Sequence, residues 1–160
     1  MPGKRLPLHK LGDHSAYGEY IELFRRTCLG KPIVDPLGRE VEFPPYAYAH
    51  ICLKPRPHEA GYVSVEASWQ ADRAERIGWI EVALRDPDEI RPNHQFRSSR
   101  NQAYLLTVEP DVPEARTTEF FYVTVQPEGA KVVFLSAFPV DHRYWRDARK
   151  GGKALYRRVD

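Results

Sequence analysis

Residues 119–138 read EFFYVTVQPEGAKVVFLSAF and contain two apolar runs separated by a turn signal. Both runs are rich in β-branched and aromatic residues, the PEG between them is typical of a tight turn, and Pro139 ends the second run. QAYLLTV at 102–108 is a third run of this kind, and EIRPNHQF at 89–96 is a weaker one. These patterns predict consecutive strands joined as an antiparallel meander.

Helical patterns precede these strands. SAYGEYIELFRRTCLG at 15–30 places its apolar residues on one face and ends at Gly30, a natural C-terminal cap, and a second helical pattern runs over 68–85. IVDPLGREVEF at 33–43 resembles a small hairpin, PPYAYAHICLK at 44–54 is a short apolar segment, and ALYRR at 154–158 could return as a closing strand. The order predicts an α+β fold with N-terminal helices packed on a single, mainly antiparallel sheet of about four strands.

Length and composition predict one globular domain over residues 1–160, with 1–13 as a candidate flexible segment. The chain is 42% hydrophobic, and none of its apolar runs approaches the roughly 20 residues of a membrane span. The start of the chain lacks the apolar core of a signal peptide, so we expect a cytoplasmic location, including the cytoplasm of a target cell into which the protein is delivered. Cys28 and Cys52 are expected to be reduced and structural, with a disulfide as the alternative.

The charge is unevenly distributed, although the net charge is only +2. Residues 141–158 hold seven Lys or Arg against two acids, which gives +5, whereas residues 109–128 hold one Arg against five Glu or Asp, which gives −4. A basic pole of this kind would attract a phosphate backbone. The alternative is a solvated surface of mixed charge.

Several common catalytic motifs are missing from the sequence. It contains no P-loop, dinucleotide fingerprint, HExxH motif, pair of CxxC motifs or GxSxG elbow. His50 and Cys52 lack partner ligands nearby in the chain, and Cys28 lies on an apolar helical face that would not activate a thiol. We therefore expect no metal site and no cofactor.

A series of short motifs resembles the phage-type branch of the barnase, EndoU, colicin E5/D and RelE-like (BECR) nuclease superfamily. In chain order these motifs are HI at 50–51, DPDEI at 86–90, RSSRNQAYLL at 97–106, FLSAFP at 134–139 and KGGKALYR at 150–157. The similarity covers roughly residues 34–158. It implies a small, metal-independent endoribonuclease, often a toxin, in which the ribose 2′-hydroxyl attacks the adjacent phosphate and leaves a 2′,3′-cyclic phosphate.

The resemblance also implies site residues. His50, Arg100 and Ser136 are the catalytic candidates, because a histidine can transfer protons near neutral pH, a guanidinium matches phosphate oxygens, and a hydroxyl can donate to a phosphate. Their alternatives are a half-buried histidine bonded to a carbonyl, a solvated loop arginine and a polar residue at a strand end. The residues expected to bind substrate are Arg97, Tyr104, His142, Arg143, Tyr144, Lys153 and Tyr156. For Tyr104 the favoured alternative is packing in the sheet. The choice between His50 and His142 as the base is left open.

The expected partners are RNA, with tRNA as one candidate, and an antitoxin or immunity protein. No association with a membrane is expected. A second hypothesis is a non-enzymatic module whose basic face binds nucleic acid or protein, because aromatic side chains beside arginine stack bases and anchor interfaces equally well. An enzyme requires a cleft where a histidine, an arginine and a hydroxyl converge, whereas a binding module tolerates their dispersal.

Overall fold

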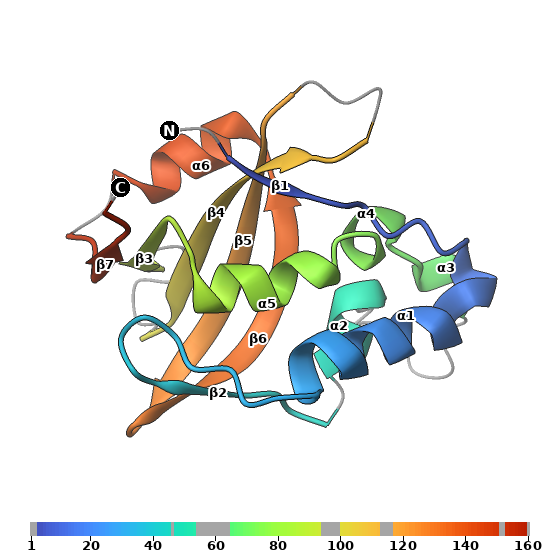
Figure 1. Cartoon of the computed structure of the whole chain (residues 1–160), viewed down its shortest axis with the longest axis horizontal. Helices are drawn as coiled ribbons and strands as arrows, with labels where there is room; N and C mark the ends of the chain where they lie inside the picture. Colours follow the sequence, from blue (N-terminus) through green and yellow to red (C-terminus); the bar gives the residue numbers. More distant parts are fainter. Residues whose placement is uncertain are drawn as a thin grey trace.

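The computed structural model describes residues 3–45, 47–53, 65–93, 100–112, 117–150 and 153–159. Within these ranges the strands form one curled sheet in the order β2-β6-β5-β4-β3-β7, and β1 pairs with the end of β4 beyond β3 (Figure 1). The strands are β1 Lys4–Leu6, β2 Glu40–Glu42, β3 Glu89–Pro92, β4 Gln102–Pro110, β5 Glu119–Glu128, β6 Lys131–Val140 and β7 Tyr156–Arg157.

The prediction of a single, mainly antiparallel sheet of about four strands is wrong. Over the described residues the sheet has seven strands and is mixed, because β1 runs parallel to β4 and β2 runs parallel to β6. Both added strands are only three residues long, KRL and EVE, which is too short to show the alternation of a strand. They are formed by pairing with long neighbours rather than by their own propensity.

The strands of the predicted meander are present. β4, β5 and β6 pair antiparallel in sequence, and the β5–β6 turn contains Gly129 with a φ of 64°, a conformation that glycine adopts without strain. β7 pairs antiparallel with β3 through Glu89 and Ile90, so the C-terminal segment closes that edge of the sheet as expected.

The helices depart from the prediction in two places. The described helices are α1 Tyr17–Phe24, α2 Ala47–Cys52, α3 Val65–Ser68, α4 Ala71–Ala74, α5 Gly78–Arg85 and α6 His142–Ala148, with a 3-10 turn His14–Ala16 and a π-helical turn Arg25–Leu29 that extends α1. The helix predicted over 68–85 begins later, because Trp69 forms a β-bridge with Leu53 and the Gln70 N–H donates to the Cys52 carbonyl. It is also split, because a turn over 75–77 separates α4 from α5, where the Arg76 and Ile77 N–H groups bond three residues back. The predicted N-terminal placement of all helices also fails, since α6 follows the last long strand.

Two clusters of buried side chains lie on opposite faces of the sheet. The larger one packs α1, α2, α4 and α5 against the sheet, and Figure 1 shows α5 crossing in front of the central strands. Its largest members are Trp79, Tyr20, Tyr104, Phe24, Phe121 and Phe134. The smaller cluster lies beneath α6 and consists of Ala103, Leu105, Tyr122 and Trp145. In the part of the chain that the structure describes, each helix is too short or too polar to cross a membrane.

Candidate functional site

Polar side chains occupy the sheet face that carries the smaller cluster. Strand alternation and the pairing register place Glu89 on this face, in one row with Leu105, Tyr122 and Phe138. The next row contains Arg91, Ala103, Thr124 and Ser136. Glu89, Arg91 and Thr124 are all buried, and a buried polar side chain in a sheet requires a specific partner or a function.

Glu89 is the centre of this face. Its side chain is 4% exposed, and its carboxylate accepts from Arg149 Nε at 2.7 Å and Arg157 Nε at 3.0 Å. Arg91 Nη1 lies 3.4 Å from the same carboxylate. Arg149 caps the C-terminal end of α6, and Arg157 belongs to β7, so one carboxylate connects three elements. A buried carboxylate without such cations would pay a large desolvation cost.

The arginines leave an excess of positive charge around Glu89. The side chains of Arg149 and Arg157 are 49% and 67% exposed, and only their Nε atoms bond to a described residue. Their Nη groups therefore remain available to a ligand. Arg158 adds little to this excess, because it pairs with Asp88 and Asp86. Two partly exposed guanidinium groups, Arg149 and Arg157, beside one carboxylate are an arrangement that attracts a phosphate.

These groups open into a pocket of about 530 Å³, which we call the arginine pocket. It is lined by Asp88, Glu89, Thr107, Thr118, Phe120, Trp145, Arg149, Arg157 and Arg158. Small-molecule sites usually occupy about 300–1,000 Å³ and combine apolar walls with a few polar groups. The Phe120 and Trp145 rings, whose centres are 4.9 Å apart, supply the apolar wall here.

His142 lies at the aromatic wall of this pocket. Its ring centre is 5.5 Å from that of Phe120. The helix begins here because the Asp141 carboxylate accepts from the Tyr144 N–H at 2.7 Å. His142 and Arg149 are seven positions apart, which is two helical turns, so both project toward the same side of α6. A proton-transfer group thus lies against Phe120, a wall residue of the pocket, on the side of α6 that also carries Arg149.

Ser136 has a partner on its own sheet face. Its hydroxyl is 2.8 Å from the Thr124 hydroxyl, across the β5–β6 pair, and the side chain is half-buried. This row adjoins the row of Glu89, which brings Ser136 to the same face as the arginine pocket. Arg100 precedes β4 and is exposed, and no hydrogen bond or ion pair joins it to the described residues.

His50 lies on α2, a helix that packs into the larger core through Ala47, Ile51 and Cys52. The histidine itself is exposed, and it bonds to neither Arg100 nor Ser136 in the described ranges. Ser136 points to the face opposite Ala137, which belongs to the larger core. The structure therefore does not join the three catalytic candidates in one hydrogen-bonded group, and their roles stay predictions.

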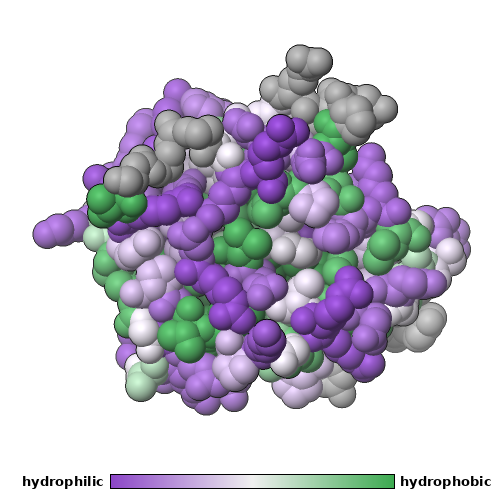
Figure 2. Space-filling model, in the orientation of Figure 1, coloured by the Kyte–Doolittle hydropathy of each residue, from purple (hydrophilic) through white to green (hydrophobic). Residues whose placement is uncertain are grey.

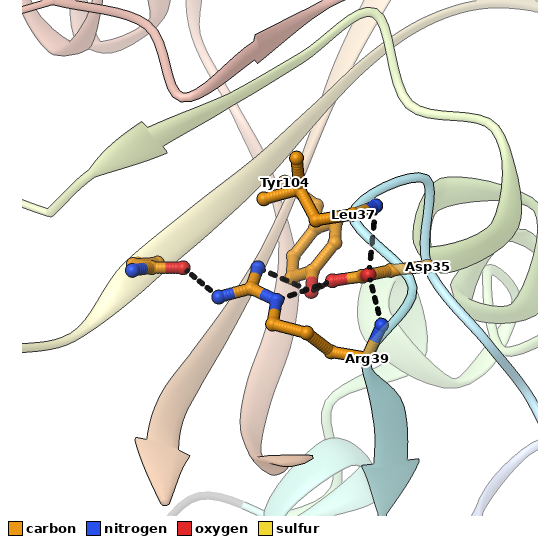
Figure 3. Close-up of polar contacts among 5 residues, drawn as sticks. Asp35, Leu37, Arg39 and Tyr104 are labelled. Carbon is orange, nitrogen blue, oxygen red and sulfur yellow. Dashed lines mark hydrogen bonds and ion pairs between the residues drawn. The ribbon is translucent and has the colours of Figure 1, made fainter. Parts of the chain in front are cut away.

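Tyr104 projects into the larger core, where it joins a closed polar network (Figure 3). Its hydroxyl donates to Asp35 Oδ2 at 2.5 Å, and burial together with this bond raises the pKa of the phenol. Asp35 also accepts from the backbone of Leu37 and from both the backbone and Nε of Arg39, whose Nη1 donates to Gln102 Oε1 at 2.7 Å. These bonds attach the 35–39 turn to β4.

The other residues expected to bind substrate are scattered around α6 and β7. Arg143 and Lys153 are exposed, and Tyr144 packs edge-on against Tyr122 with ring centres 5.3 Å apart. Tyr156 pairs with Ile90 through the backbone and packs against the larger core. Arg97 lies outside the described residues.

Sequence reasoning missed the central residue of the site. Glu89 belongs to the DPDEI motif at 86–90, which supported the family resemblance but was given no role for its glutamate. Arg149 and Arg157 entered only the count of positive charges over 141–158. The alternation of Glu89 and Arg91 around Ile90 was the available signal, because a strand that points two charges to one face is not built for an apolar core. The ion pairs across 60 and 68 positions could not be read from spacing.

Comparisons of the chain with protein-family models, with curated proteins and with solved structures found no match.

Proposed function

We propose that the protein is a metal-independent endoribonuclease and that the arginine pocket is its active site. The observation that carries this proposal is the convergence of the buried Glu89 carboxylate with the partly exposed guanidinium groups of Arg149 and Arg157 in an open pocket, with a histidine packed against its wall at Phe120. RNA cleavage by the 2′-hydroxyl needs a base, an acid and cations that stabilise the charge on the pentacoordinate phosphorus. Glu89, Arg149 and Arg157 line the pocket, and His142 packs against its wall at Phe120.

Each group has a defined role in this proposal. Glu89 accepts the proton of the 2′-hydroxyl as the 2′-oxygen bonds to phosphorus. Arg149 and Arg157 bind the non-bridging oxygens through their Nη groups. His142 donates a proton to the 5′-oxygen as its bond to phosphorus breaks. The products are a 2′,3′-cyclic phosphate and a 5′-hydroxyl, which is the chemistry that the family resemblance also implies.

The toxin-like character and the neutralising partner implied by the resemblance belong to the same proposal. An antitoxin or immunity protein would block the enzyme by covering an exposed cationic opening. Arg149 and Arg157 present such an opening, because both are half-exposed or more. An acidic partner surface would match it in charge.

One observation favours a second candidate, a non-enzymatic RNA-binding module. Both carboxylate oxygens of Glu89 bond to arginines, and a purely structural ion-pair cluster that ties α6 and β7 to the sheet would use the same contacts. Such a module would bind RNA through the exposed arginines and leave it intact.

The decisive experiment is cleavage of a defined single-stranded RNA in EDTA by the wild type, Glu89→Gln and Arg149→Gln. We expect losses of about 10²–10⁴-fold in rate for Glu89→Gln and about 10²–10³-fold for Arg149→Gln. Glu81→Gln is the matched control, because Glu81 makes a partly exposed ion pair with Arg85 on α5. Binding without cleavage by the folded wild type would favour the binding module, and cleavage unaffected by Glu89→Gln would remove the pocket from the mechanism.

Two histidine variants test the assignment of the acid. His142→Ala should slow cleavage by about 10²-fold or more, and His50→Ala should leave the rate near that of the wild type, because His142 packs against the pocket wall at Phe120 whereas His50 lies on α2. The reverse result would place the chemistry near α2, as the family resemblance implies for His50. Arg100→Gln and Ser136→Ala, assayed alongside, measure the contributions of the other two catalytic candidates.

A further inference from the structure

The outer side of α6 carries a stripe of cations that the active-site proposal leaves unused. Arg143, Arg146 and Lys150 follow each other at helical spacings of three and four, on the side away from the buried Trp145. All three are exposed, and in the described part of the chain Arg143 and Arg146 form no ion pair. Hydrophilic side chains cover the upper left of Figure 2, where Figure 1 places α6.

This stripe begins next to the arginine pocket. Arg149, which contacts Glu89, is three residues from Arg146 and six from Arg143. Helical rise places Arg146 about 4.5 Å and Arg143 about 9 Å from Arg149 along the axis. At these spacings the three arginines can contact neighbouring phosphates of one RNA strand in turn.

We propose that the outer side of α6 binds the phosphates that flank the cleaved bond, so that the substrate is a single-stranded polynucleotide rather than a mononucleotide or dinucleotide. The inference rests on the proposed function for the position of the cleaved bond. Charge complementarity carries it: Arg143 and Arg146, which form no ion pair with the described residues, lie within two helical turns of Arg149. Single strands fit best, because a duplex could not present one nucleotide between Glu89 and the aromatic wall without unstacking it.

The test is the salt dependence of binding to a 2′-O-methyl RNA 12-mer, which lacks the nucleophile and cannot be cleaved. Fluorescence anisotropy between 50 and 200 mM salt gives the slope of log K against log salt. Each single-strand phosphate contact contributes about 0.7 to this slope, so Arg143→Gln/Arg146→Gln should flatten it by about 1.4. The control Arg25→Gln/Arg26→Gln removes the same charge from exposed positions on the π-helical turn, whose buried Cys28 faces the larger core, and should leave the slope unchanged.

The two proposals fail in different ways. An unchanged slope in the α6 double variant, or an equal change in the control, would overturn the role of α6 even if RNA is cleaved. A flattened slope confined to the α6 variant would support that role even if unmodified RNA stays intact, in which case the nuclease proposal falls instead. Single variants Arg143→Gln and Arg146→Gln, each expected to flatten the slope by about 0.7, keep the test decisive if the double variant does not fold.

Discussion

Replacing Asp35 with asparagine should destabilise the fold more than any other single change in the polar network of Figure 3. The Asp35 side chain is fully buried and accepts four hydrogen bonds: two from backbone N–H groups, one from Arg39 Nε and one from Tyr104. Asparagine keeps one oxygen for the backbone groups but turns an N–H₂ group toward Arg39 Nε, which is itself a donor. The Arg39 side chain, 16% exposed, would lose its only counter-charge among the described residues.

The magnitude follows from these contacts. Removing one partner of a buried ion pair costs about 3–5 kcal/mol, and the partial exposure of Arg39 places Asp35→Asn near 3 kcal/mol. Tyr104→Phe removes one bond to a charged group and should cost about 1.5–3 kcal/mol. In a chain of this length, 3 kcal/mol corresponds to a fall in Tm of about 6–12 °C.

Chemical denaturation followed by circular dichroism measures the free energy of unfolding of both single variants and the double variant. The control is Asp111→Asn, which breaks an exposed ion pair with Arg5 and should cost less than about 1 kcal/mol. Non-additive losses in the double variant are expected, because Asp35 and Tyr104 share a bond. A loss below 1 kcal/mol for Asp35→Asn, or additive losses, would refute the idea that this network fastens the 35–39 turn to β4.

Three further predictions concern thiols, a turn and the pocket wall. Burial raises the pKa of both Cys28 and Cys52 to about 12. Neither thiol should therefore react with a thiol reagent in the native protein at pH 8. Alkylation of the native protein as fast as that of the unfolded protein would contradict this prediction. Thiols of the unfolded chain ionise near pH 9, whereas the two buried thiols of the folded protein stay protonated, so the free energy of unfolding should fall as the pH rises from about 9 toward 12. An increase in the free energy of unfolding over that range would contradict this prediction. Gly129→Ala should cost about 1 kcal/mol by the same denaturation measurement, because alanine is strained at this positive φ. A neutral or stabilising effect would show that alanine fits the turn without strain. Trp145→Ala should lower the free energy of unfolding by about 3 kcal/mol and weaken RNA binding in an anisotropy titration, since it removes the packing of α6 on Phe120. An unchanged affinity would show that the position of α6 does not affect RNA binding.

The long strands were predictable because their own residues determine them. β5 and β6 have the alternation, aromatic content and turn residues of a hairpin, and these signals are local. β1 was missed because three residues with a charge at their centre carry no periodic signal, and its partner on β4 decides it. β2 lies in the hairpin predicted over 33–43, where Val34 bridges Glu40, but its parallel pairing with β6 could not be read from the local sequence. The late start of the helix predicted over 68–85 comes from Leu53, which pairs with Trp69 from 16 positions earlier in the chain.

In the candidate site, too, the features set by the local sequence were predictable and those set by strand pairing were not. Composition correctly located a concentration of basic residues after Asp141, but it could not show that Arg149 and Arg157 turn back onto one carboxylate of β3. Tyr104 illustrates the opposite difficulty: it follows Arg100 closely in sequence, yet alternation in β4 directs it into the core, toward Asp35. Short-range spacing predicts which side chains share a strand, and only the pairing of strands decides which of them meet.

The most direct test of the central claim uses an RNA oligonucleotide with a single 2′-deoxy nucleotide, incubated with the protein in EDTA. If Glu89 accepts a proton from the 2′-hydroxyl, the bond after that nucleotide should stay intact while the corresponding bond in the all-ribose oligonucleotide is cut, with 2′,3′-cyclic phosphate ends that Glu89→Gln does not form. Cleavage at the deoxy position, or products with 5′-phosphate ends, would contradict the proposed chemistry and the role of the arginine pocket in it.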